Sequence, residues 1–176
     1  MIGKIHGGDV ASHGPNVKGD RAGKFAAGMR WAGRPWWRCS WEPTVTLTQL
    51  IYYSQPFGFD EAMLNGILLQ ARRNNARNNL TGALVVRADL YLQLLEGPEA
   101  AVTATFDKIR QDNRHLAVRL LARQSVAERL FPDWTMRDDP AQSWLWSAED
   151  VGNGALDHAA PAELAAVFER VAADLP

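Results

Sequence analysis

From Val45 onward, apolar residues recur with two different periods, two residues as in strands and 3.6 residues as in helices. β-Branched and aromatic residues fill positions 45–53 and give way to turn residues at 54–58, which predicts a first strand. Asp60 is a candidate N-cap for a helix that ends at Arg73 in an asparagine-rich stop. The ordered part of the chain therefore opens with a strand followed by a helix.

Five further segments continue this alternation. Residues 80–87 and 90–96 predict two strands of a hairpin. A helix is predicted over 98–112, where a proline occupies the start. Strands are then predicted over 117–124 and 134–137. The order predicts an α+β fold, a ferredoxin-like β-α-β-β-α-β-β sheet with both helices on one face.

The third predicted strand is largely apolar on both sides. Because side chains alternate along a strand, Tyr91, Gln93 and Leu95 share one face and three leucines share the other. The second face therefore needs a cover besides the two helices. We expect a C-terminal helical cap within 138–176, an acidic segment in which Pro161 begins a helix. The apolar stripe of that helix comprises Leu164, Val167, Phe168, Val171 and Leu175.

Composition is that of an ordinary soluble globular chain, since 47% of the 176 residues are apolar and 22% are charged. Net charge is −1, but residues 1–44 carry +4 and residues 45–176 carry −5. The single cysteine, Cys39, excludes an internal disulfide and favours a reducing compartment. The chain lacks both a run of ~18 to 20 apolar residues and a secretory signal. We expect a cytoplasmic protein without a membrane partner.

Residues 1–44 hold eight of the 14 glycines and four of the seven tryptophans, without a helix or strand period. We interpret them as a mostly disordered extension that precedes a domain at 45–137. The basic and aromatic run over 30–41 is compatible with stacking on single-stranded nucleic acid or with a membrane surface. We favour a solvated tail and expect no nucleic-acid partner.

Four polar side chains within predicted strands and helices are candidates for chemistry. Gln93 lies among leucines, where a buried amide is costly unless it is hydrogen-bonded; a glutamine on a wet sheet face explains it equally well. Tyr52 belongs to the first strand, and its hydroxyl either anchors to a partner or belongs to a packed core residue. Asn74 and Asn75 are most simply helix stop signals.

No motif for hydrolytic or metal chemistry appears in the sequence. Asp112, Arg114 and His115 follow the second predicted helix, but charged residues at a helix end usually point to water, and a lone histidine is rarely a ligand. A metal-ligand constellation, a glycine-rich phosphate loop and a Ser-His-Asp order are all missing. We therefore expect neither an enzyme nor a metal site.

Short motifs occur in a fixed order over residues 47–137, which are 91 of the 176 residues. They are Leu50-Ile51-Tyr52-Tyr53-Ser54, Asn74-Asn75 with Leu80-Thr81-Gly82, Leu92-Gln93-Leu94-Leu95-Glu96-Gly97, Asp112-Asn113-Arg114-His115, and Arg129-Leu130-Phe131 with Trp134-Thr135-Met136. No single motif is decisive. The ordered set resembles the BLUF family of flavin-based blue-light sensors.

This resemblance implies the same ferredoxin-like fold and an FAD cofactor whose ring lies between the two helices. Tyr52 matches the tyrosine next to the flavin, and Gln93 matches the glutamine that switches. Asn75 matches the asparagine that bonds the polar edge of the ring, with Asn74 as its neighbour. The residues matched to the flavin carbonyl edge and ribityl chain are Asp112, Arg114 and His115. The residues matched to a fifth-strand pair that exchanges near the glutamine are Trp134 and Met136.

The resemblance also implies a mechanism and a mode of signalling. Blue light lets Tyr52 pass an electron and a proton to the flavin, after which Gln93 rearranges by rotation or tautomerisation and absorption shifts to the red. The receptor then signals through its own oligomer or through a partner protein. The alternative is a ferredoxin-like binding module without a chromophore, for example one that recognises RNA on its sheet. An acylphosphatase-like enzyme needs an arginine in the loop at 55–59, which has none.

Overall fold

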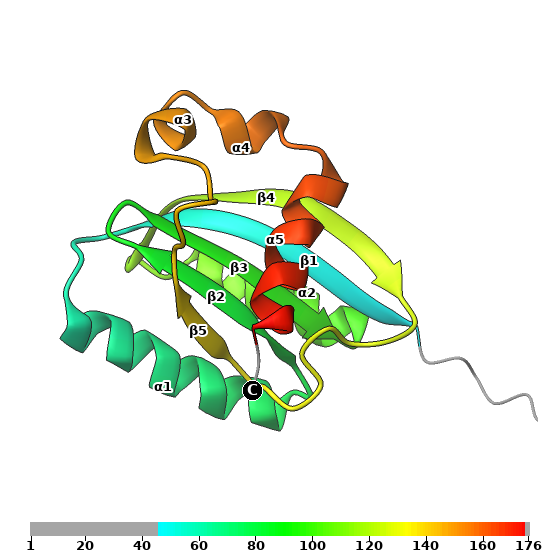
Figure 1. Cartoon of the computed structure of the whole chain (residues 1–176). Helices are drawn as coiled ribbons and strands as arrows, with labels where there is room; N and C mark the ends of the chain where they lie inside the picture. The colour runs from blue at the N-terminus through cyan, green and yellow to red at the C-terminus, as the bar shows by residue number, and fades with distance from the viewer. Residues whose placement is uncertain (1–45, 175–176) are drawn as a thin grey trace, which may run out of the picture. The chain divides into compact units, whose positions relative to one another are not determined.

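The structure of the chain is a computed structural model that describes residues 46–174. Its elements, in chain order, are β1 (Leu47–Pro56), α1 (Glu61–Arg77), β2 (Thr81–Arg87), β3 (Leu90–Gly97), α2 (Glu99–Arg110), β4 (His115–Val126), β5 (Arg137–Pro140), α3 (Ala148–Gly152), α4 (Ala155–His158) and α5 (Pro161–Ala173). The strands form one sheet in the order β4-β1-β3-β2-β5 (Figure 1). All pairs are antiparallel except β2 with β5. The predicted ferredoxin-like α+β fold is confirmed.

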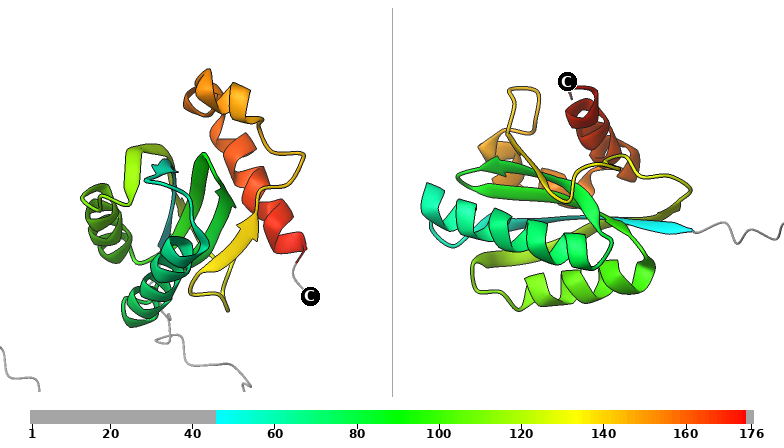
Figure 2. Two further views of the ribbon diagram at one scale, coloured as in Figure 1. Left: turned by 90° about the vertical axis from the view of Figure 1, so that its left-hand side faces the viewer. Right: turned by 90° about the horizontal axis from the view of Figure 1, so that it is seen from below.

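The sheet separates two apolar cores. Helices α1 and α2 cover one face, and α5 covers the other, as the edge-on view in Figure 2 shows. Alternation along β3 sends Tyr91, Gln93 and Leu95 toward α1 and α2, whereas the leucines between them pack toward α5. The predicted helical cap is therefore confirmed. The residues of α5 that bury against the sheet are Leu164, Val167, Phe168 and Val171.

The first helix begins where the sequence predicts and ends later. The carboxylate of Asp60 accepts a backbone N–H of the first turn at 2.6 Å, so the predicted N-cap is confirmed. The prediction that this helix ends at Arg73 is wrong, because α1 continues to Arg77. The stop is made by the second asparagine pair. Asn78 is the C-cap, and Asn79 has a left-handed φ of 54°.

The predicted fifth strand is present, but its predicted bounds of 134–137 are wrong, since β5 runs from Arg137 to Pro140. The carbonyls of residues 134–136 are taken by other partners. One accepts the backbone N–H of Gly82, and the other two accept hydrogen bonds from the side chains of Asn75 and Arg72 on α1. The segment is therefore held by helix side chains before it becomes a strand.

Some predictions fall outside the described residues. These are the disordered extension at 1–44 and the contribution of Leu175 to the apolar stripe. Within residues 46–174, no helix combines the length and the hydropathy needed to cross a bilayer.

The ends of β1 and β4 meet in an irregular pairing that positions a later site residue. β1 runs into the predicted turn as far as Pro56, which pairs with His115 at the start of β4. Two register shifts interrupt the pairing, and Ala117 has a φ of +48°. An L-residue with a Cβ is strained in this left-handed region. The irregular pairing at the start of β4 thus places His115 in the interior, and Ala117 adopts a strained backbone conformation there.

We expect Ala117→Gly to raise the free energy of unfolding by up to about 1 kcal/mol, because glycine adopts this backbone without a Cβ clash. Ala122→Gly is the control, since Ala122 lies in the same strand with an ordinary φ. That variant should lower the stability by about 0.5–1 kcal/mol or more. Urea denaturation measures the free energy of unfolding of both variants. An equal loss in the two variants would contradict the strain at Ala117.

Candidate functional site

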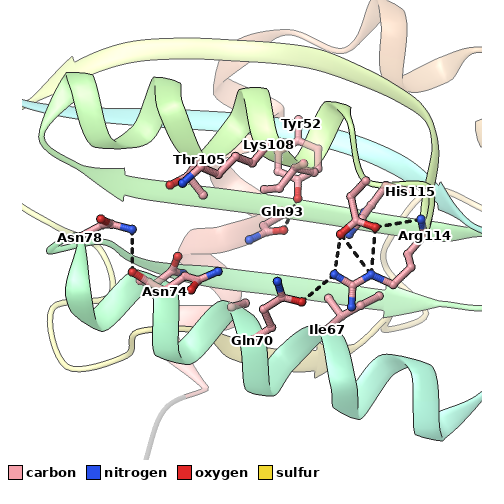
Figure 3. Close-up of a pocket in the computed structure, with 14 residues that line it drawn as sticks. Tyr52, Ile67, Gln70, Asn74, Asn78, Gln93, Thr105, Lys108, Arg114 and His115 are labelled. Atoms are coloured by element: carbon pink, nitrogen blue, oxygen red, sulfur yellow. Dashed lines mark hydrogen bonds and ion pairs between the residues drawn. The ribbon is translucent and has the colours of Figure 1, made fainter.

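A cavity of about 200 Å³ lies between α1 and α2 on the helix-covered face of the sheet (Figure 3). Tyr52 from β1 and Gln93 from β3 form its floor, and the two helices form its walls. The residues that line it are Tyr52, Ile67, Gln70, Ala71, Asn74, Asn75, Asn78, Gln93, Thr105, Lys108, Ile109, Asp112, Arg114 and His115. The walls combine aliphatic side chains with a dense set of amides and charged groups.

Tyr52 and Gln93 are opposite one another in the β1–β3 pairing and are 0% and 5% exposed. The Tyr52 hydroxyl donates a hydrogen bond to Gln93 Oε1. Gln93 Nε2 donates a weak hydrogen bond to Met136 Sδ at 3.5 Å. The buried, hydrogen-bonded interpretation of Gln93 is therefore correct, and the wet sheet face is not.

The phenol of Tyr52 is held in its neutral form. Burial raises the pKa of the hydroxyl far above its usual value, and the negative charge of Asp112 adds to the shift. The ring packs against Phe106 of α2, with the two centroids 5.3 Å apart. Tyr52 is thus a fixed hydrogen-bond donor toward Gln93 at any ordinary pH.

The last turns of α1 present two amides in different directions. Asn75 is buried, and its Nδ2 donates to the carbonyl of Thr135 at 2.7 Å. Asn74 is exposed at the mouth of the cavity, and its backbone carbonyl accepts a hydrogen bond from the Asn78 side chain at 2.8 Å. Consecutive helix positions differ by roughly 100°, so one amide faces β5 while its neighbour faces the cavity mouth. The helix continues past both to Arg77, so they are not its stop, and both line the cavity.

A carboxylate and a guanidinium close one end of the cavity. Nε and Nη2 of Arg114 donate to Asp112 in a forked arrangement, at 2.9 and 2.5 Å. Arg114 Nη2 also donates to Gln70 Oε1 at 2.8 Å, which links this end to α1. Arg114 holds the pKa of Asp112 below its usual value, and Asp112 raises the pKa of Arg114. Both side chains are therefore charged, and each is fixed by the other.

His115 is a neutral member of the site. Burial lowers the pKa of its imidazole, and nearby Arg114 lowers it further, although Asp112 opposes the shift. Its Nδ1 lies 2.9 Å from the hydroxyl oxygen of the buried Ser54. Among residues 46–174, no group of three or more His, Cys, Asp or Glu side chains is arranged to hold a metal ion.

The structure brings most of the predicted site residues together. Those that line the cavity are Tyr52, Asn74, Asn75, Gln93, Asp112, Arg114 and His115. Met136 does not line it, but it is buried against the Gln93 amide. Trp134 is 39% exposed, away from the cavity, and its ring lies 5.2 Å from the guanidinium of Arg137. Of the predicted pair, Met136 thus occupies the place beside Gln93.

The remaining lining residues were missed from the sequence. They are Ile67, Gln70, Ala71, Asn78, Thr105, Lys108 and Ile109. All lie on α1, on α2 or at the C-cap of α1, at steps of three and four residues. This helical spacing could have indicated which residues line the cavity. It does not do so alone, because a helix face that packs in a core has the same period.

Several known proteins are similar to the part of the chain that contains the cavity. Photoactivated adenylate cyclase subunit beta of Euglena gracilis is 39% identical over 94 residues, which are 52% of this chain and 11% of that protein. The dark-state structure of the BLUF protein BlrB matches with a TM-score of 0.63 and 29% identity, covering 75% of this chain and 99% of BlrB. The structure of a bacterial light-regulated adenylyl cyclase matches with a TM-score of 0.55 and 25% identity, covering 70% of this chain and 39% of the cyclase. The chain spans about a tenth of the length of its Euglena relatives.

A sequence model of the BLUF family, described as sensors of blue light using FAD, matches residues 47–137. This span is more than half of the chain and includes β1 to β4, both cavity helices and the segment with Met136. The resemblance seen in the motifs is confirmed. The chain belongs to the BLUF family of blue-light sensors, whose cofactor is FAD.

Proposed function

We propose that this chain is a blue-light receptor that binds FAD non-covalently in the cavity between α1 and α2 and signals through Tyr52 and Gln93. The observation that carries the proposal is the buried hydrogen bond from Tyr52 to Gln93 at the floor of that cavity. Gln93 has donor and acceptor capacity beyond its bonds to Tyr52 and Met136, and a polar ring in the cavity would use it.

The donor set of the cavity suits a flavin. Ile67 and Ala71 of α1 face Ile109 of α2 across it, which provides apolar walls for a flat aromatic ring. The amides of Asn74, Asn75 and Gln93 supply the donors and acceptors that ring carbonyls and nitrogens require. Lys108 adds a positive charge at the cavity that suits the diphosphate of FAD, whereas the charge of Arg114 is paired with that of Asp112.

Tyr52 acts as the donor of an electron and a proton. When bound, FAD supplies the absorption of blue light and the electron acceptor. Because its pKa is raised, Tyr52 holds its proton until it is oxidised. The proton then has a defined path, since the hydroxyl already donates to Gln93 Oε1.

Gln93 is the element with two states. Its amide accepts from Tyr52 at one end and donates to Met136 at the other. Rotation of the Gln93 amide exchanges the positions of its donor and its acceptor. Tautomerisation moves a hydrogen from its nitrogen to its oxygen. Neither change alters the shape of the side chain much. The two forms therefore differ mainly in their hydrogen-bond partners, which allows one buried side chain to record illumination.

The output of the chain is proposed to be a contact and not a reaction. The Euglena relatives are named as adenylate cyclases, and they are far longer than this chain. After β5, the described residues form only the cap of α3 to α5 over the sheet. Because the family model that matches residues 47–137 describes sensors of blue light, we propose that this receptor acts on a partner protein or on a second copy of itself and does not catalyse a reaction.

The first test is the spectrum. The purified chain of residues 1–176 should bind FAD, absorb blue light, shift its absorption to the red on illumination and return to the original spectrum in the dark. A chain that stays colourless after incubation with FAD would rule out the receptor and favour a ferredoxin-like binding module without a chromophore.

Gln93→Leu should bind FAD but lose the red shift, because no amide remains to exchange partners. It should also lose about 1–3 kcal/mol of stability, since the buried Tyr52 hydroxyl is left unpaired. Gln124→Leu is the control, because Gln124 is an exposed glutamine of β4 outside the cavity. The proposed role of Gln93 fails if both variants shift normally under difference spectroscopy.

Tyr52→Phe should keep FAD and the ring contact with Phe106 but abolish the light-induced shift, because the proton-coupled donor is gone. Tyr91→Phe is the matched control. Tyr91 is also buried on this face of the sheet, and its hydroxyl has no hydrogen-bond partner among the described residues. Flash spectroscopy should show a normal shift in Tyr91→Phe; a normal shift in Tyr52→Phe would remove Tyr52 from the mechanism.

A further inference from the structure

β5 is held weakly by the sheet itself. It has four residues, pairs in parallel with β2 alone and has no strand on its other side within residues 46–174. Short edge strands open more easily than central ones. Met136, the residue before β5, is nevertheless 1% exposed beside Gln93. Contacts from outside the sheet must therefore help to keep it there.

Helix α1 supplies those contacts. Nδ2 of Asn75 donates to the carbonyl of Thr135 at 2.7 Å. Nε of Arg72 donates to the carbonyl of Met136 at 3.1 Å, and its Nη2 pairs with Asp138 Oδ1 at 2.6 Å. Arg72 and Asn75 are three positions apart, so both project from one face of α1. This one turn of α1 therefore makes hydrogen bonds to three of the four residues from 135 to 138.

The same helix turn also contributes to the cavity. Ala71, Asn74 and Asn75 line it, whereas Arg72 does not. A rearrangement of the Gln93 amide changes the group that faces Met136. Rotation places Oε1 against the sulfur, and tautomerisation removes a hydrogen from Nε2, so either change weakens the N–H to sulfur contact. The position of Met136 then depends more heavily on its backbone contacts with α1.

We propose that the bonds of Arg72 to the Met136 carbonyl and to Asp138 form an α1–β5 latch that holds Met136 against Gln93 and thereby sets the lifetime of the lit state. This inference rests on the proposed function and names a positioning residue for it. The latch favours the dark arrangement, so weakening it slows the return to the dark state. The side chains of Arg72 and Asp138 are 44% and 46% exposed, which makes their ion pair sensitive to salt.

The test is Asp138→Asn in the full chain loaded with FAD, which removes the charge while keeping an oxygen acceptor. The lit-state lifetime should lengthen about two- to fivefold, the factor expected from an exposed ion pair. The dark spectrum should not change, because neither latch residue lines the cavity. Asp157→Asn is the control: it breaks another exposed ion pair, with Arg119, whose N–O distance is also 2.6 Å.

Salt separates the latch from a general loss of stability. Raising the ionic strength from about 0.02 M to about 0.5 M shortens the Debye length from roughly 20 Å to roughly 4 Å. Recovery of the original protein and of Asp157→Asn should slow over this range, and recovery of Asp138→Asn should not. An unchanged lifetime in Asp138→Asn, or an equal change in Asp157→Asn, overturns the proposal.

Hydrogen exchange in the dark tests the latch without photochemistry. Backbone amides of residues 135–139 should exchange faster in Asp138→Asn than in Asp157→Asn, because only the first variant weakens one of the contacts between this segment and α1. Equal exchange in the two variants overturns the latch. If the original protein shows no red shift, the proposed function fails, and the exchange result still decides whether Arg72 and Asp138 hold β5.

Discussion

A primary amide that is buried must find partners for two donor hydrogens and two acceptor lone pairs, and this constraint shapes the site around Gln93. Tyr52 satisfies one acceptor position, while Met136 takes one hydrogen with a weak bond. The rest of the amide's capacity needs a polar occupant in the cavity. Because the two ends of an amide are nearly equal in size, the same constraint permits a second arrangement at little steric cost.

Room for that occupant next to Gln93 lies on the face of the sheet that α1 and α2 cover. Under α5, leucines of β3 meet a continuous apolar surface. Under α1 and α2, the facing positions toward the open end are short or polar, as in Ala71, Asn74 and Thr105. Such residues do not fill the gap between two helices as leucines would. The cavity is therefore a consequence of composition on two helix faces, whereas the sheet below it is ordinary.

Periodicity predicted the elements well where local residues decide them, and less well where distant residues do. The end of α1 was misplaced by a turn because either asparagine pair is an acceptable stop, and only the capping contacts of Asn78 select the second. β5 was misplaced because its residues, Arg137–Pro140, have little strand character and are held by β2 and α1. The burial of Gln93 required the β1–β3 register, and its role came from resemblance and not from the pattern.

The most direct route from the cavity to the surface runs along α1 to β5 rather than through the sheet. Leu92 and Leu94, which flank Gln93 on β3, are buried in the core under α5. The segment before β5 instead rests on polar contacts that can be exchanged one at a time. Beyond β5, Arg87 of β2 donates to the carbonyl of Trp146 at 2.6 Å, so the connection to the cap is fixed at its far end. Between β5 and this contact, residues 141–145 form the junction between the sheet and its cap, and the N–H of Ala141 at its start donates to the carbonyl of Val86 on β2 at 2.9 Å.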